Sequence, residues 1–66
     1  MNIEGYRAEV RPLSPRLGSG FVAFAPQLVG CVSDGESRVI ALLHLKDAIE
    51  CWLEEARARG RFIPMI

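Results

Sequence analysis

The pattern of apolar and polar positions predicts three strands in the first half of the chain. From Tyr6 to Arg11 apolar residues at even positions alternate with charged residues at odd positions, a period of two that predicts a half-buried strand over residues 3–13. Residues 21–25 are apolar throughout, so a second strand there would have two apolar faces. A short third strand is expected at residues 31–34. Pro12 has no backbone N–H, so it marks the end of the first strand or an edge position.

The second half of the chain has the period of a helix. Apolar residues recur every three or four positions from Ala41 to Ala56, with charged residues opposite, which predicts one amphipathic helix over residues 38–59. Ser37 is the expected N-cap and Gly60 the expected C-cap. Residues 61–66 are expected to be an extended tail, either a fourth strand or a clamp over the core.

Residues 14–20 contain Pro15, Gly18 and Gly20 and are typical of a hairpin loop, which makes the first two strands antiparallel. The element order β-β-β-α therefore predicts an α+β fold, in which a small antiparallel three-stranded sheet packs on one long helix. A short C-terminal strand remains an option. A length of 66 residues allows a single domain, residues 1–66.

Half of the residues are hydrophobic, which is more than a body of this size can bury. The second strand has an apolar face to spare, and the helix begins with apolar residues beside its main stripe. A broad core stripe is one interpretation of these helix residues, and a contact between subunits is the other. We predict a homodimer or homotetramer whose interface contains Val22, Phe24, Val39, Ile40 and Leu43.

The formal net charge is zero, which argues against binding to nucleic acid through phosphate contacts, and DNA binding is not expected. Charged side chains of the first strand and of the turn before the helix are instead candidates for contacting another protein. These predicted partner-binding residues are Arg7, Glu9, Arg11, Asp34 and Glu36. A small RNA-binding module remains the alternative, because arginines near the end of the helix could form a basic stripe.

No catalytic, metal or cofactor site is expected. His44 is the only histidine, and the two cysteines, Cys31 and Cys51, form no CxxC pair and are expected to be small buried hydrophobes. A small hydrolase that uses Asp34 or His44 is a third interpretation. Neither a signal peptide nor an apolar run of about 20 residues is present, so a cytoplasmic protein with no membrane partner is expected.

Several short motifs occur in one order along residues 6–64. An aromatic strand leads to a Pro-x-Leu-x-Gly-Cys turn, a Gly-x-Ser helix start, an Ala-Ile-x-x-Trp-Leu helix end and a final Gly-x-x-Ile-Pro. The positions are Phe21 to Phe24, Pro26, Leu28, Gly30, Cys31, Gly35, Ser37, Ala48, Ile49, Trp52, Leu53, Gly60, Ile63 and Pro64. Their order and spacing resemble the N-terminal domain of HicB-type antitoxins. Val29, His44 and residues 38–40 depart from the family, which often has Pro, Asn and Pro-Glu-Glu there.

The resemblance implies a partial ribonuclease-H-like fold and a protein that binds HicA, a small RNA-cleaving toxin with a double-stranded-RNA-binding-like fold. Full-length HicB proteins usually add a C-terminal DNA-binding domain. Because this chain stops two residues after Pro64, we expect no such domain and no repressor activity. The expected function is a non-enzymatic, stand-alone antitoxin domain that works as a homo-oligomer, with a HicA-like toxin as its candidate partner.

Overall fold

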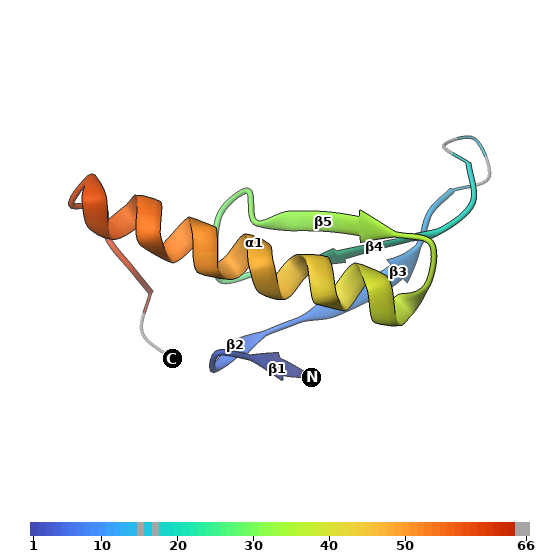
Figure 1. Cartoon of the computed structure of the whole chain (residues 1–66), viewed down its shortest axis with the longest axis horizontal. Coiled ribbons are helices and arrows are strands. Elements are labelled where there is room, and N and C mark those ends of the chain that lie inside the picture. Colours follow the sequence, from blue (N-terminus) through green and yellow to red (C-terminus); the bar gives the residue numbers. More distant parts are fainter. Residues whose placement is uncertain (15, 17, 65–66) are drawn as a thin grey trace.

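A computed structural model describes residues 1–14, 16 and 18–64 of the chain. The elements are β1 (Asn2–Ile3), β2 (Tyr6–Arg7), β3 (Glu9–Pro12), β4 (Phe21–Phe24), β5 (Val32–Gly35) and α1 (Arg38–Ala58). Strands β3, β4 and β5 form an antiparallel sheet with β4 in the centre, and β1 and β2 form a separate hairpin. Helix α1 lies along one face of the sheet, mainly over β5 and β4 (Figure 1). The predicted α+β fold is therefore confirmed.

The prediction of one strand over residues 3–13 was wrong. Glu4 and Gly5 both have positive φ, 54° and 84°, so the chain reverses there and Ile3 pairs with Tyr6. Two central residues with positive φ are what a tight two-residue hairpin needs, and glycine adopts that conformation at little cost. The predicted alternation is present after the turn, since Tyr6 and Ala8 are buried while Arg7 is exposed.

The core lies between the inner face of the sheet and α1. Leu28, Leu45 and Ile49 are its largest fully buried side chains, and Ala23 of the central strand lies against them without any exposed surface. Small residues such as Ala23 let the helix approach the sheet closely. Leu28 comes from the turn between β4 and β5, where its N–H donates to the Ala25 carbonyl.

Both ends of α1 are capped: the N-cap is Ser37 as the sequence predicts, whereas the C-cap is Arg59, one residue before the predicted Gly60. The Ser37 hydroxyl accepts a hydrogen bond from the Ile40 N–H at 3.1 Å, which satisfies one of the free donors of the first turn. At the other end Gly60 has a φ of 65° and its N–H donates to the Arg57 carbonyl. The Arg61 N–H donates to the Ala56 carbonyl, which completes a Schellman motif and turns the chain away from the helix axis.

Residues 61–64 form no strand and follow the other predicted alternative, a clamp over the core. The Tyr6 hydroxyl donates to the Pro64 carbonyl at 2.8 Å, and Ile63 packs against the buried residues. Residues 65–66 of the predicted tail and Pro15 of the predicted hairpin loop lie outside the described residues. The hairpin itself is present, because the Leu13 N–H donates to the Gly20 carbonyl at 2.9 Å.

Candidate protein-binding surface

The face of the sheet turned away from α1 carries an apolar centre with charged neighbours. Ala23 faces the helix, so Val22 and Phe24 face the other way, because successive strand residues alternate between faces. Opposite residues of antiparallel strands share a face, and the register therefore adds two residues from β3 and two from β5. We call this set the outer sheet face: Glu9, Arg11, Val22, Phe24, Val32 and Asp34.

Ion pairs and an aromatic contact organise this outer sheet face. The Glu9 carboxylate pairs with Arg7 at 3.4 Å and with Arg11 at 3.6 Å. The Arg11 guanidinium also lies 5.6 Å from the centroid of the Phe24 ring. The long arginine side chain thus helps to explain why Phe24 is only half-exposed on an open face. Exposed ion pairs of this kind contribute little to stability, so these charges can exchange partners at small cost.

The outer sheet face unites residues that the sequence assigned to two different roles. Val22 and Phe24 were predicted for self-association, whereas Glu9, Arg11 and Asp34 were predicted for partner binding. Arg7, also predicted for partner binding, joins them through its ion pair with Glu9. Sequence reasoning missed Val32, which is 55% exposed beside Phe24. The sequence signal that could have found it is alternation: Val32 follows the buried Cys31, so its side chain lies on the other face of the sheet.

The three helix residues predicted for self-association lie elsewhere and do not form one surface. Val39 and Leu43 are 66% and 61% exposed and line an apolar depression of about 240 Å³, together with Met1, Ile3, Leu42 and Lys46. Ile40 is 38% exposed and lines another depression, with Asp34, Glu36 and His44. Each residue turns about 100° from the last along a helix, so neighbours such as Val39 and Ile40 point in different directions.

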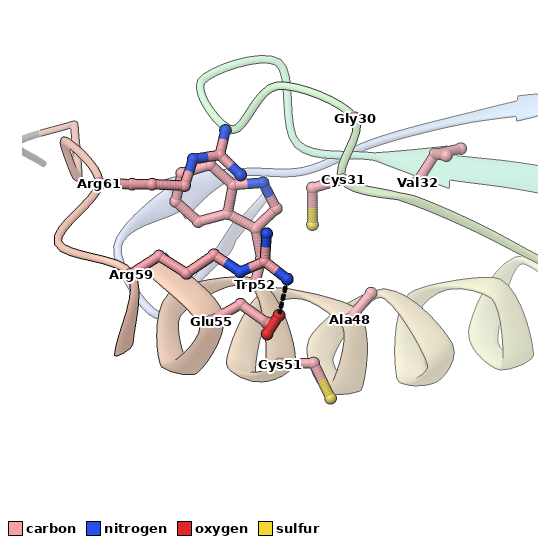
Figure 2. A pocket seen from close by; sticks show the side chains of 9 residues that line it. All are labelled: Gly30, Cys31, Val32, Ala48, Cys51, Trp52, Glu55, Arg59 and Arg61. Carbon is pink, nitrogen blue, oxygen red and sulfur yellow. Dashed lines mark ion pairs between the residues drawn. The ribbon is translucent and has the colours of Figure 1, made fainter. Parts of the chain in front are cut away.

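A third depression, of about 420 Å³, lies between the start of β5 and the second half of α1 (Figure 2). The Arg61 guanidinium lies 5.4 Å from the centroid of the Trp52 ring, and Arg59 pairs with Glu55 at 3.4 Å. The Trp52 ring N–H donates to the Val29 carbonyl at 2.9 Å. These contacts hold the wall of the depression, and Phe62 beyond it is 81% exposed.

Both cysteines line this third depression, but only one fits its prediction. Cys31 is buried as expected, and burial raises the pKa of its thiol. Cys51 is exposed, so the prediction that it is a buried hydrophobe was wrong. The reason is its position on α1, to one side of the buried stripe that contains Ile49 and Leu53. Both thiols are free.

His44 and Asp34, the residues of the hydrolase interpretation, do meet. The contact joins His44 Nδ1 to the backbone carbonyl of Asp34 at 2.6 Å, so the ring nitrogen donates and the carbonyl accepts. This geometry fixes the imidazole against the edge of β5. Across the described residues, no group of three or more His, Cys, Asp or Glu side chains is placed to hold a metal ion. No helix in residues 1–14, 16 and 18–64 is long and apolar enough to cross a membrane.

Comparison with known proteins gives one similarity. The chain is 48% identical over 40 residues to a UPF0150 protein of Helicobacter pylori (strain J99). The alignment covers 61% of this chain and 56% of the relative, so the chain spans about half the length of the protein it matches. No protein-family model matches the chain, and no solved structure matches it.

Proposed function

We propose that this protein is a non-enzymatic protein-binding module of the antitoxin kind, which neutralises a small RNA-cleaving toxin similar to HicA. It works in the cytoplasm as a homo-oligomer. The observation that carries the proposal is the outer sheet face, where Val22, Phe24 and Val32 form an apolar centre beside charged side chains. The order of motifs from Phe21 to Pro64, which resembles HicB antitoxins, gives the toxin class. The similarity to a UPF0150 protein agrees with this but names no activity.

The apolar centre and the two carboxylates of the outer sheet face would suit a basic protein partner that displaces Arg7 and Arg11 from Glu9. Binding sites between proteins commonly have an apolar centre with an aromatic anchor, which Phe24 would supply, and a polar rim. A protein that cleaves RNA needs cationic side chains to hold phosphates. The Glu9 and Asp34 carboxylates would pair with such cations, and the toxin could not then use them on RNA.

Affinity capture followed by a cleavage assay tests the proposal. A tagged form of the chain is expressed in its own cells, and the captured partner is expected to be a small basic protein that cleaves RNA. Adding the untagged chain in equal amount should stop that cleavage. Capture of no RNA-cleaving protein, or cleavage that continues at saturating chain, would contradict the antitoxin role.

A matched pair of phenylalanine variants locates the contact. Phe24→Ala should weaken capture and inhibition by at least about tenfold, since buried aromatic anchors commonly contribute 2 kcal/mol or more. Phe62→Ala removes the same side chain from a site that is 81% exposed and away from the outer sheet face, and it should bind normally. Equal loss in both variants, or none in Phe24→Ala, would refute this assignment of the surface.

RNA binding is the second candidate function, and one observation favours it. Arg61 stacks on Trp52 close to the exposed Phe62, and cation–aromatic surfaces of this kind bind single-stranded RNA. The formal net charge of zero weighs against it. A gel shift with single-stranded RNA at low salt distinguishes the two functions. A shift that disappears in Phe62→Ala but persists in Phe24→Ala would support RNA binding.

A further inference from the structure

Strand β5 is an edge strand with backbone groups that face outward. The Ala25 N–H donates to the Cys31 carbonyl, so in this antiparallel pair the residues that bond to β4 are Cys31 and every second residue after it. Val32 and Asp34 therefore point their N–H and C=O groups away from β4. Within the described residues only the Asp34 carbonyl has a partner, the His44 ring. Figure 1 shows β5 along the upper margin of the molecule, with no element drawn beyond it.

The opposite edge of the sheet, β3, offers one outward N–H, that of Val10, where β5 offers two. Pro12 has no N–H to offer, and the Ala8 N–H just before the strand already donates to the Met1 carbonyl at 2.8 Å. Exposed charges of Arg7 and Arg11 flank this edge. The two edges therefore differ, and β5 is the better one for accepting another strand.

The flank of α1 beside β5 is suited to a second helix. His44, Ala48, Cys51 and Glu55 follow each other at spacings of four, three and four residues, so they form one ridge. Ala48 and Cys51 line the third depression together with Cys31 and Val32; in Figure 2 the Ala48 side chain points toward the strand and the Cys51 side chain points away from it. Small residues in the middle of such a ridge allow helix axes to approach to about 8–10 Å.

We propose that β5 pairs antiparallel with β5 of a second copy, so that two chains form one six-stranded sheet with two antiparallel helices on the same face. This interface rests on the homo-oligomer part of the proposed function and gives it a location. It also makes the two outer sheet faces continuous, so that the toxin-binding surface is built from both copies.

The position of His44 selects the register. The His44 ring already bonds to the Asp34 carbonyl, so Asp34 cannot be the residue that pairs with its own copy. The twofold axis therefore passes between the two copies of Val32, and the N–H and C=O of each Val32 bond to those of the other. The two exposed valines then meet on the outer sheet face. Val32 lines the third depression together with Ala48 and Cys51, which places the helix crossing near these two residues, and the ridge then places His44 opposite Glu55 of the other copy. The His44 end of each ridge thus meets the Glu55 end of the other ridge only when the two helices are antiparallel.

The area needed for a stable contact favours a second copy over an isolated peptide. A stable interface removes roughly 800 Å² from each partner, which is about one sixth of the 4666 Å² that this chain exposes. The four residues of β5 span only about 13 Å. The ridge from His44 to Glu55 adds a length of about 16 Å. A second copy presents both a strand edge and a helix at the same spacing, whereas a peptide strand covers only the edge.

Solution mass and a matched pair of valine variants test this interface. Light scattering over a dilution series should give a dimer of twice the 7.3 kDa chain. Val32→Lys should weaken dimerisation by about 30-fold or more, because two lysines would face each other at about 5 Å across the new strand pair. Val39→Lys makes the same change at a valine that is 66% exposed on the other flank of α1, and it should dimerise normally. Equal effects of the two substitutions would overturn the assignment.

Cross-linking gives a second readout that does not depend on a destabilised variant. A short bismaleimide should join the wild-type chains through Cys51, and Cys51→Ser should abolish the cross-linked dimer. In the Cys51→Ser background, Leu43→Cys on the other flank of α1 should not cross-link. A dimer that joins through position 43 but not 51 overturns this interface while the homo-oligomer stands. A monomer at every concentration overturns both, and toxin capture then tests the remaining function separately.

Discussion

Gly35 lets β5 lie close to the first turn of α1, and replacing it with alanine should separate the two. A Cβ at this position would lie 2.6 Å from the Ala41 nitrogen and 2.9 Å from the Ile40 carbonyl carbon. Both are backbone atoms of the first helical turn, so no side-chain rotation can make room. The helix would have to move away from the strand, and contacts of the buried Ala41 would be lost with it.

The expected cost of Gly35→Ala is about 3 kcal/mol, at the upper end of the range for overpacked cores, because backbone rather than side chain must shift. A domain of this size has a total stability of about 3–5 kcal/mol. If the wild type has about 3 kcal/mol of unfolding free energy, the variant should be close to half unfolded without denaturant. If the wild type has about 5 kcal/mol, the variant should retain about 2 kcal/mol. Such a change is large enough to measure directly.

Urea unfolding, followed by Trp52 fluorescence and far-UV circular dichroism, measures this cost. Protein concentration must be the same for all variants, since association adds to apparent stability. Gly30→Ala is the matched control, because Gly30 has a φ of 77° but nothing within 4 Å of a built Cβ. It should cost only about 1 kcal/mol for the left-handed conformation. If Gly35→Ala is as stable as Gly30→Ala, the close approach of strand and helix does not control stability and the reasoning fails.

Three further changes test the caps, the tail and the buried thiol. Ser37→Ala should lower the unfolding free energy by about 1 kcal/mol in urea, whereas Ser37→Asp should retain most of it. Tyr6→Phe removes the hydrogen bond to Pro64, so limited proteolysis should cleave the C-terminal tail faster, at a stability cost of about 1 kcal/mol. Burial raises the pKa of Cys31 in the folded state, so its contribution to stability is present below the unfolded pKa of about 8.5 and is lost as pH rises above it. Urea midpoints from pH 7 to 10 should fall more in wild type than in Cys31→Ala; equal slopes would contradict this.

The sheet and the helix could be predicted because their periods of two and 3.6 are local properties of the chain. The turn at Glu4 and Gly5 could not be seen in the same way. A two-residue hairpin places Ile3 directly opposite Tyr6 on one face, so the buried positions change from odd (Ile3) to even (Tyr6, Ala8) across the turn. With Ile3 as the only buried residue before the turn, the sequence pattern there is too short to show this change. The C-terminal tail was left between two alternatives because its contact with Tyr6 joins residues 58 positions apart.

The exposed face of strand residues could be predicted from the sequence, whereas the grouping of exposed helix residues into one surface could not. Alternation correctly placed Val22 and Phe24 away from the core. On the helix, apolar neighbours in sequence were taken together, although Val39 and Ile40 lie on different depressions. Which strand edge remains open depends on Pro12 and on a backbone contact to Met1, and the second of these is a property of the folded chain alone.

The unequal edges of the sheet have a consequence for how far assembly can proceed. When two copies join through β5, each end of the combined sheet is a β3 strand, where Pro12 interrupts the row of donors. A third chain therefore finds only one outward N–H, that of Val10, along the edge that it would have to extend. Growth is self-limiting, and a small protein that is half hydrophobic can associate through a strand without providing a template for fibrils.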